Sequence, residues 1–471
     1  MRFAATPAGR QAAALQSCTV KQPALAAAGE FGYEGRAGHR LKSTNERVEY
    51  VRSGLSKRSA LGFILVTLTL NSMGIGLMMP VMPSLLTELT ELPVSEAARW
   101  GGALSVVYAL MQFAFGPTLG NISDRFGRRP VLLVSMFTMA IDYLIMALSW
   151  HLAILFIGRI LSGVAGATFS AASAYIADVS TKEERAKNFG LVGAGFGVGF
   201  VLGPMIGGFL GEYGSRAPFY AAAALSFANF LFGYFVLPET LRQENRRAFD
   251  WKRANPLGAL KQLSAHPEVR TLLLAVFLFD IAHYVYPAVW SYYSEEVFGW
   301  SPADIGFSLA FVGIGFAFVQ GYLIRVLEPK LGPGKTLLAG LSANLIAFAG
   351  LAVTSSGTMA YALICFAALG ALATPAFTAL MSNRIDDNAQ GELQGLISSA
   401  AGLSMVVSPF VMTQVFATFS GPDAAVSFPG APFALAGLLI LASLAIALPF
   451  IRLRPAPQSV TRPGDRETPA Q

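Results

Sequence analysis

Long apolar runs recur along almost the whole chain and constrain its fold more than any other feature. A membrane-spanning helix needs about 20 mostly apolar residues, and twelve stretches of that kind follow one another. They cover residues 60–83, 97–119, 131–149, 152–177, 189–212, 218–237, 270–294, 303–327, 336–354, 359–383, 391–419 and 431–451. Charged residues make up only 13% of the chain, roughly half of the usual share of about 25%. The sequence therefore predicts an all-α membrane protein with twelve transmembrane helices and excludes a soluble enzyme.

Positive charge is distributed unequally among the short loops between these runs. The loops that follow even-numbered runs contain ten Lys and Arg residues, whereas the opposite loops contain only Arg99 and Arg216. Loops rich in Lys and Arg stay in the cytoplasm, so we expect both termini and the longest connector to be cytoplasmic. The formal net charge of +6 is thus a sign of orientation, and we expect no nucleic acid as a partner.

The longest interior polar stretch divides the apolar runs into two groups of six. We expect a cytoplasmic tail at 1–58, which is disordered or reflects a start codon assigned too far upstream, and a second tail at 453–471. Between them lie an N-terminal six-helix bundle at 59–237, a connector at 238–269 and a C-terminal six-helix bundle at 270–452.

The two halves share a faint repeat at a constant offset of 205 residues. The matches are Arg125-Phe126-Gly127 with Lys330-Leu331-Gly332, Gly190-Leu191 with Gly395-Leu396, and Pro204 with Pro409. One offset that persists over separated segments indicates two pseudo-symmetric bundles. In duplicated proteins of this kind the binding site lies between the halves near the membrane midplane. Transporters have this architecture more often than membrane enzymes do.

The sequence offers little for metal or cofactor chemistry. Cys18 and Cys365 lie in different environments and the four histidines lack ligand spacing, so we expect no metal site and no cofactor. A phosphate-binding loop of the G-x-x-x-x-G-K-[ST] type is missing as well. An ion gradient is therefore the expected source of energy.

The segment after the second run, expected to be a loop, has a particular order of Gly, Asp and Arg. It reads Gly116-Pro-Thr-Leu-Gly-Asn-Ile-Ser-Asp-Arg-Phe-Gly-Arg-Arg-Pro130, and its glycines permit tight turns. This order resembles the signature loop of the major facilitator superfamily. The matching residues are Gly116, Gly120, Asp124, Arg125, Gly127, Arg128 and Arg129. The resemblance implies that Asp124 and Arg125 form a charged gating latch that breaks during alternating access, and we count Asp178 with this latch.

The fifth run carries a glycine at every fourth position: Gly195, Gly199, Gly203, Gly207 and Gly211. Such a row predicts a groove for close contact with neighbouring helices. The segment Gly203-Pro204-x-x-Gly207-Gly208 also resembles the antiporter signature of drug-exporting branches of the superfamily. That resemblance implies export.

Four further segments resemble the tetracycline-efflux branch, and the whole resemblance covers about residues 59–452. They are Met73–Pro83, Asp142-Tyr143, Ala174–Asp178 and Gln390–Gly395. The sequence departs from this branch at Asn71 and Asn344, where tetracycline/proton exchangers carry acids, and near Phe316, where they carry a histidine. The resemblance implies drug efflux across a bacterial inner (plasma) membrane, and the departures leave the compound open.

Ionisable residues inside the runs are the candidates for proton coupling. A charge at the centre of a spanning helix costs about 2.5–3.5 kcal/mol on insertion scales and so needs a reason. Asp142 and Arg159 lie in the third and fourth runs, and Arg159-x-x-x-Gly163 resembles the arginine motif linked to proton transfer in drug/proton antiporters. Asp280 and His283 share one face of the seventh run, and an imidazole titrates near neutral pH. We therefore expect Asp280 with His283 to carry the coupling proton, and the other pair is the second candidate.

Uncharged polar residues inside the runs can line a substrate cavity or hydrogen-bond between helices. The candidates are Asn71, Gln112, Gln320 and Asn344. The favoured interpretation is proton-coupled export of a small, largely apolar organic compound or drug. The expected partners are that substrate, protons and the lipid bilayer, and the protein is expected to be monomeric. Proton-coupled uptake of a metabolite is the second interpretation, and a non-transporting receptor or membrane-embedded enzyme is the third.

Overall fold

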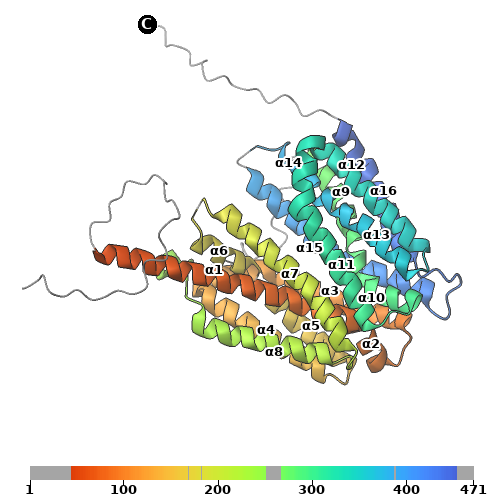
Figure 1. Ribbon diagram of the computed structural model, residues 1–471, viewed down its shortest axis with the longest axis horizontal. Helices are drawn as coiled ribbons and strands as arrows, with labels where there is room; N and C mark the ends of the chain where they lie inside the picture. The colour runs from red at the N-terminus through yellow and green to blue at the C-terminus, as the bar shows by residue number, and fades with distance from the viewer. Residues whose placement is uncertain (1–43, 168, 182, 251–266, 387–388, 453–471) are drawn as a thin grey trace, which may run out of the picture. The chain divides into compact units, whose positions relative to one another are not determined.

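The computed structural model of the protein describes residues 44–167, 169–181, 183–250, 267–386 and 389–452 (Figure 1). Within these ranges all regular elements are helices, and eleven helical stretches are long and apolar enough to cross a membrane. These stretches belong to one unit of the chain, Ser56–Gln471. Residues 1–43 of the predicted tail 1–58, the predicted tail 453–471 and the connector residues 251–266 lie outside the described residues.

The crossings follow the order expected from the apolar runs. The first half consists of α1 (Thr44–Met78) with η1 (Met79–Val81) and α2 (Met82–Thr90), α3 (Val94–Phe126), α4 (Arg128–Leu148), α5 (Leu152–Gly166) with α6 (Phe169–Val179), α7 (Arg185–Gly211) and α8 (Ala217–Val236). The second half consists of α9 (Pro267–His283) with α10 (Val285–Phe298), α11 (Pro302–Phe318), η4 (Val319–Leu323) and α12 (Ile324–Val353), α13 (Gly357–Leu369) with η5 (Gly370–Leu372) and α14 (Ala373–Ser382), α15 (Gln390–Ser420) and α16 (Ala431–Arg452). Between the halves lies the short η2 (Gln243–Asn245).

The longest helical stretch, Pro302–Val353, supplies two crossings. Its 52 residues would form a straight helix about 78 Å long, whereas the hydrocarbon core is about 30 Å thick. The stretch is broken at Gly332, whose φ of 75° and ψ of 163° are not helical. Gly127, between α3 and α4, has a similar conformation with φ 110° and ψ 158°. Because the 205-residue repeat relates these glycines, the two halves turn at equivalent places and the chain has the twelve predicted crossings.

The structure corrects two boundaries. The segment 116–130 was expected to be a loop, but α3 continues as a helix to Phe126 and the chain turns only at Gly127. The glycines and proline of this segment are compatible with a helix, because neighbouring helices in a membrane protein compensate for them. The first helix begins at Thr44, so residues 44–58 are helical although the sequence predicts a tail there.

The glycine row of α7 brings this helix into backbone contact with its neighbours. A Cβ atom added at Gly199 would collide with the backbone oxygen of Thr69 in α1. On another face, a Cβ at Gly208 would lie 3.0 Å from the Cα of Gly306 in α11. The groove predicted from the glycine spacing is therefore present, and α7 uses its small residues to contact helices of both halves.

The two halves meet through helix ends on one side of the membrane. Tyr292, near the end of α10, packs against Gly101, near the start of α3. Glu212, after α7, accepts a hydrogen bond from the backbone N–H of Ala303 at the start of α11 (Oε1–N 3.0 Å). Successive crossings alternate in direction, so these helix ends face the same side. The charge pattern predicts this side to be the outer one.

Gly199→Ala should destabilise the folded protein, because the new methyl group would meet the backbone of α1 at Thr69. Overpacking of this kind costs about 1–3 kcal/mol, so we expect a lower melting temperature of the purified protein in detergent. Gly197→Ala is the matched control on the same helix, since a Cβ there has nothing within 4 Å. Equal melting temperatures of the two variants would contradict the backbone contact.

Candidate functional site

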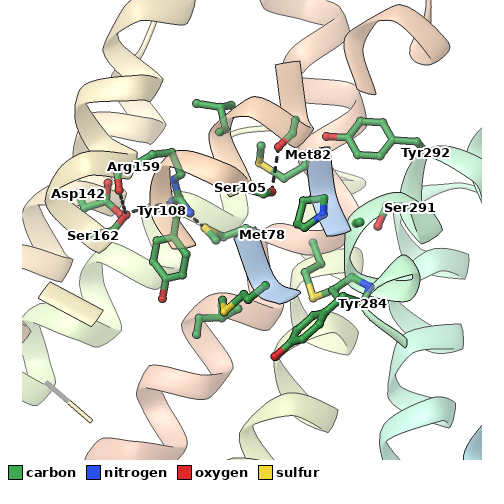
Figure 2. A pocket seen from close by; sticks show the side chains of 18 of the residues that line it. Met78, Met82, Ser105, Tyr108, Asp142, Arg159, Ser162, Tyr284, Ser291 and Tyr292 are labelled. Carbon is green, nitrogen blue, oxygen red and sulfur yellow. Dashed lines mark hydrogen bonds and ion pairs between the residues drawn. The ribbon is translucent and has the colours of Figure 1, made fainter. Parts of the chain in front are cut away.

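A cavity of about 170 Å³ lies between the two halves, and we call it the main cavity because of this position. Helices α1 to α5 line one side, and Tyr284, α10 and α15 line the other (Figure 2). Thioether, hydroxyl and aromatic groups surround two charged side chains. The lining residues are Ile75, Met78, Met79, Met82, Gly101, Leu104, Ser105, Tyr108, Met139, Asp142, Tyr143, Arg159, Ser162, Tyr284, Pro287, Ala288, Ser291, Tyr292, Met405 and Pro409. The cavity thus lies where the sequence repeat predicts a site, between the halves.

Asp142 and Arg159 face each other in the wall of this cavity (Figure 2). The Nη2 atom of Arg159 lies 3.5 Å from Oδ2 of Asp142 and 3.3 Å from the sulfur of Met78. The guanidinium group also lies over the ring of Tyr108, 5.6 Å from its centroid. Gly158 leaves room for the pair, because a Cβ there would lie 2.7 Å from Oδ1 of Asp142. This glycine lets α4 and α5 approach closely enough for the ion pair to form.

This ion pair is long and incompletely hydrogen-bonded. Asp142 is 0% exposed and Arg159 is 7% exposed. Among the described residues, Oδ1 of Asp142, Nε of Arg159 and the hydroxyl of Tyr143 have no hydrogen-bond partner. Buried charged groups are normally paired and hydrogen-bonded throughout. Oδ1 of Asp142 can therefore bind a proton, and all three atoms can hydrogen-bond to a water molecule or to a polar group of a ligand. Nowhere in the described ranges do three or more His, Cys, Asp or Glu side chains form a group that could hold a metal ion.

The pair preferred from the sequence, Asp280 and His283, does not line the main cavity, because the lining of that crossing begins at Tyr284. Nδ1 of His283 has no hydrogen-bond partner in the described part of the chain. Its ring instead stacks on Phe279 and on Phe316, with centroids 5.5 Å apart in each case. The resemblance implies a histidine near Phe316 in related exchangers, and here α9 contributes an imidazole to that place.

None of the four uncharged polar residues singled out in the sequence lines the main cavity. Asn71 lines a second, smaller cavity inside the N-terminal bundle. Gln112 donates a hydrogen bond to a backbone oxygen of α5 (Nε2–O 3.3 Å). Gln320 is exposed, and Asn344 is 0% exposed. A polar residue type does not reveal which face of its helix points towards the cavity.

Arg128 is the centre of the charged group at the end of α3, where the resemblance implied Asp124 and Arg125. Its Nη1 lies 2.5 Å from Oδ1 of Asp124, and its Nε lies 3.3 Å from Oδ2 of Asp178. We call Asp124, Arg128 and Asp178 the latch cluster. Arg125 is exposed, and its guanidinium lies over the ring of Phe126. In this structure Asp124 pairs with Arg128 and not with Arg125, because the turn at Gly127 brings the first residue of α4 back against the last turn of α3.

Glu239, in the connector, caps the start of α4 although the sequence analysis did not single it out. Its carboxylate accepts hydrogen bonds from the backbone N–H groups of Arg128 (2.9 Å) and Arg129 (3.3 Å). A carboxylate at a helix N-terminus satisfies free N–H groups and the positive end of the helix dipole. Further along, the N–H of Arg247 donates to the backbone oxygen of Asp124 (3.0 Å). The described part of the connector is therefore attached to the latch cluster.

The sequence analysis missed most of the cavity lining, above all its tyrosines and methionines. A signal for one wall was present in α3, because Gly101, Ser105 and Tyr108 recur at helical spacing and so share one face. No comparable signal marks the methionines, because methionine is equally suited to filling an apolar core.

Comparison with known proteins agrees with this geometry. Residues 64–409 match the family model described as Major Facilitator Superfamily. The chain is 39% identical over 363 residues to the tetracycline resistance protein, class C, of Escherichia coli, covering 77% of this chain and 91% of that protein. It is 31% identical over 382 residues to multidrug resistance protein 2 of Bacillus subtilis (strain 168), covering 80% of this chain and 91% of that protein.

A solved structure shares the fold. It is that of a bacterial homologue of the human lysosomal transporter Spinster, with a TM-score of 0.66 and 18% identity over 84% of this chain and 96% of that one. These relationships do not favour a receptor, an enzyme or an importer. The chain belongs to the major facilitator superfamily, and it is a multi-pass membrane protein that works as a secondary transporter.

Proposed function

We propose that this protein exports a small, largely apolar, drug-like compound in exchange for protons by alternating access. The observation that carries the proposal is the incompletely hydrogen-bonded pair of Asp142 and Arg159 in the wall of the central cavity. Relatives named as tetracycline and multidrug resistance proteins support an organic drug as the substrate. The ion pair supports exchange at the main cavity, and the names of the relatives support a drug as the compound exchanged.

Asp142 is the group to which we assign the coupling proton. When its carboxylate is charged, Arg159 has a counter-ion 3.5 Å away. When Asp142 takes up a proton, Arg159 loses that counter-ion in surroundings of low dielectric constant, where the loss is large. A polar group of the substrate that binds the free arginine lowers the free energy of this state. Proton and substrate thus act on the same pair, and such coupling is what exchange requires.

The lining of the main cavity supports a substrate with apolar rings and few polar groups. Methionine side chains are flexible and polarisable and adapt to ligands of different shapes. Tyrosine rings offer flat apolar faces with a hydroxyl at the edge. The lining residues of these kinds are Met78, Met79, Met82, Met139, Met405, Tyr108, Tyr143, Tyr284 and Tyr292.

For the setting of this activity, we infer a bacterial inner (plasma) membrane with both termini in the cytoplasm. The ten Lys and Arg residues in the loops after even-numbered crossings, against Arg99 and Arg216 on the other side, support this orientation. The protein acts as a monomer in this proposal, because a single chain supplies the residues that line the cavity.

Asp142→Asn should abolish accumulation of substrate against its gradient while downhill movement continues, because the variant cannot take up and release the proton. The substrate is first found with a drug panel, including tetracyclines, on cells that lack or overproduce the protein. Transport is then measured in proteoliposomes with an imposed pH gradient. The variant leaves Arg159 unpaired, which typically costs about 3–5 kcal/mol, so its melting temperature is measured alongside.

Asp280→Asn is the matched control, because Asp280 lies in a crossing but does not line the cavity. We expect this variant to keep uphill transport. If Asp280→Asn loses it and Asp142→Asn does not, the coupling proton belongs to Asp280 and His283.

Cysteine labelling should verify the orientation. In a variant without Cys18 and Cys365, Ser355→Cys should react with an impermeant thiol reagent added outside intact cells, and Gln243→Cys should not. Both positions are exposed, so access to the reagent depends on the side of the membrane. The opposite labelling pattern would reverse the proposed topology.

Arg128→Ala should slow transport more than Arg125→Ala, because Arg128 holds two carboxylates and Arg125 holds none among the described residues. A hydrogen bond to a charged group contributes about 1.5–3 kcal/mol, so we expect a decrease of about tenfold or more in the transport rate. The rates are compared at equal amounts of protein in proteoliposomes. A larger decrease of the transport rate in Arg125→Ala would show that Arg125, the residue implied by the resemblance, acts in the latch.

A further inference from the structure

A second cavity, of about 50 Å³, lies inside the N-terminal bundle among α1, α4, α6 and α8. Its lining is rich in polar side chains: Thr67, Asn71, Ser135, Ser226 and Asn229. A polar group that lacks a partner in an apolar interior costs several kcal/mol. Ser135 already donates a hydrogen bond to the backbone oxygen of Ala165 (2.6 Å), so the groups that an occupant would satisfy are those of Asn71, Ser226 and Asn229.

The polar groups of this cavity have more hydrogen-bonding capacity than the protein uses. The hydroxyl of Thr67 donates to Oδ1 of Asn229 (3.2 Å), which leaves the amide N–H groups of Asn229 free to donate. In the described ranges the side chains of Asn71 and Ser226 make no hydrogen bond. A water molecule needs a space of about 10–15 Å³ and two to four polar partners. The cavity satisfies both conditions and has room for about three waters.

The second cavity ends one helical turn from the ion pair. Met139 lines both this cavity and the main one, and Asp142 follows it one turn later on α4. At the other end Leu132 lines the cavity, one turn from Arg128 of the latch cluster. Leu132 and Met139 are about 10 Å apart along the helix axis. The cavity therefore extends from the level of Asp142 towards the side of the latch cluster.

We propose that this cavity holds a chain of waters that carries protons between Asp142 and the latch-cluster side of the membrane. The inference rests on the proposed function, in which Asp142 carries the coupling proton. In each transfer the O–H bond of Asp142 breaks and its proton joins the first water. Each water then passes on one proton, a hydronium ion leaves at the far end, and the carboxylate regains its pairing with Arg159.

This arrangement separates the routes of proton and substrate. The second cavity, of about 50 Å³, has less than a third of the volume of the main cavity, about 170 Å³. It has room for about three waters, which is too little for a drug-sized substrate. Met139 lines both spaces, so in this proposal water approaches Asp142 along α4 from the second cavity while substrate occupies the main one.

Water in the cavity can be detected without any substrate. Brief X-ray exposure turns bound water into hydroxyl radicals, which oxidise adjacent methionines to sulfoxides. Met136 lines the second cavity but not the main one, whereas Met381 and Met412 line neither and are 0% exposed. We expect Met136 to be oxidised severalfold faster than these two. Equal rates would mean a dry cavity and would overturn the proposal.

Ser226→Val should remove the waters, because it replaces a lining hydroxyl with methyl groups. It should lower the oxidation rate of Met136 severalfold. Ala224→Val is the matched control, because Ala224 lies on the same helix but is exposed, and it should leave the rate unchanged. If both variants behave like the unmodified protein, the oxidation does not report water in this cavity and the proposal fails.

The proton route can be followed through hydrogen–deuterium exchange of the Asp142 carboxyl group in membranes. The infrared C=O band of its protonated form is assigned by its loss in Asp142→Asn. Ser226→Val should slow the exchange of this band severalfold, and Ala224→Val should not. Equal exchange rates would show that protons reach Asp142 through the main cavity, which would overturn the route alone. A protein in which Asp142 never takes up a proton would overturn the proposed coupling site as well.

Discussion

The ion pair of Asp142 and Arg159 is the interaction on which the central cavity depends. The bilayer interior cannot hold an isolated charge at low cost, so α4 and α5 must bring opposite charges together, and Gly158 leaves the space for the carboxylate. The separation of 3.5 Å and the unpartnered atoms leave the pair only partly satisfied. A pair in this condition responds strongly to a proton or to a polar ligand. The same ion pair thus meets the constraint imposed by the membrane and provides the capacity for coupled transport.

The two halves repeat the same arrangement of helices, but only one half contains the buried ion pair. Gly127 and Gly332, related by the 205-residue offset, break their helices with similar backbone angles. The same offset relates the ion pair to Ala347 and Ile364, which are buried and apolar. One half therefore carries the charges of the main cavity, while the other contributes mainly aromatic and small residues to its lining. A repeated arrangement of helices allows one half to move against the other. Because only one half contains the ion pair, the proposal assigns the coupling proton to that half.

The helices are held together by different interactions at the two ends of the bundles. At one end α7 and α11 meet through glycine backbones, and Glu212 binds the start of α11. The hydrophobic effect does not drive helices together in lipid, so close backbone packing and hydrogen bonds must stabilise their contact. At the other end the latch cluster joins α3 to α6, and the connector is attached to it through Glu239. The latch cluster thus joins helices of the N-terminal half through charge, whereas the two halves meet at the opposite end through close backbone packing and a hydrogen bond.

The sequence by itself determined the number of crossings and much of their extent, because the thickness of the bilayer sets the length of an apolar helix. It also identified Asp142 and Arg159 as intramembrane charges and Gly127 as a turn. It did not decide which side chains line the cavity, and Asp280 was the preferred candidate. A helix that is apolar on every side carries no periodic signal of the face that points inward. Only the tertiary structure decided this, because contacts such as the glycine row of α7 set the rotation of each helix. That rotation made Asp142 a wall residue and left Asp280 outside the cavity.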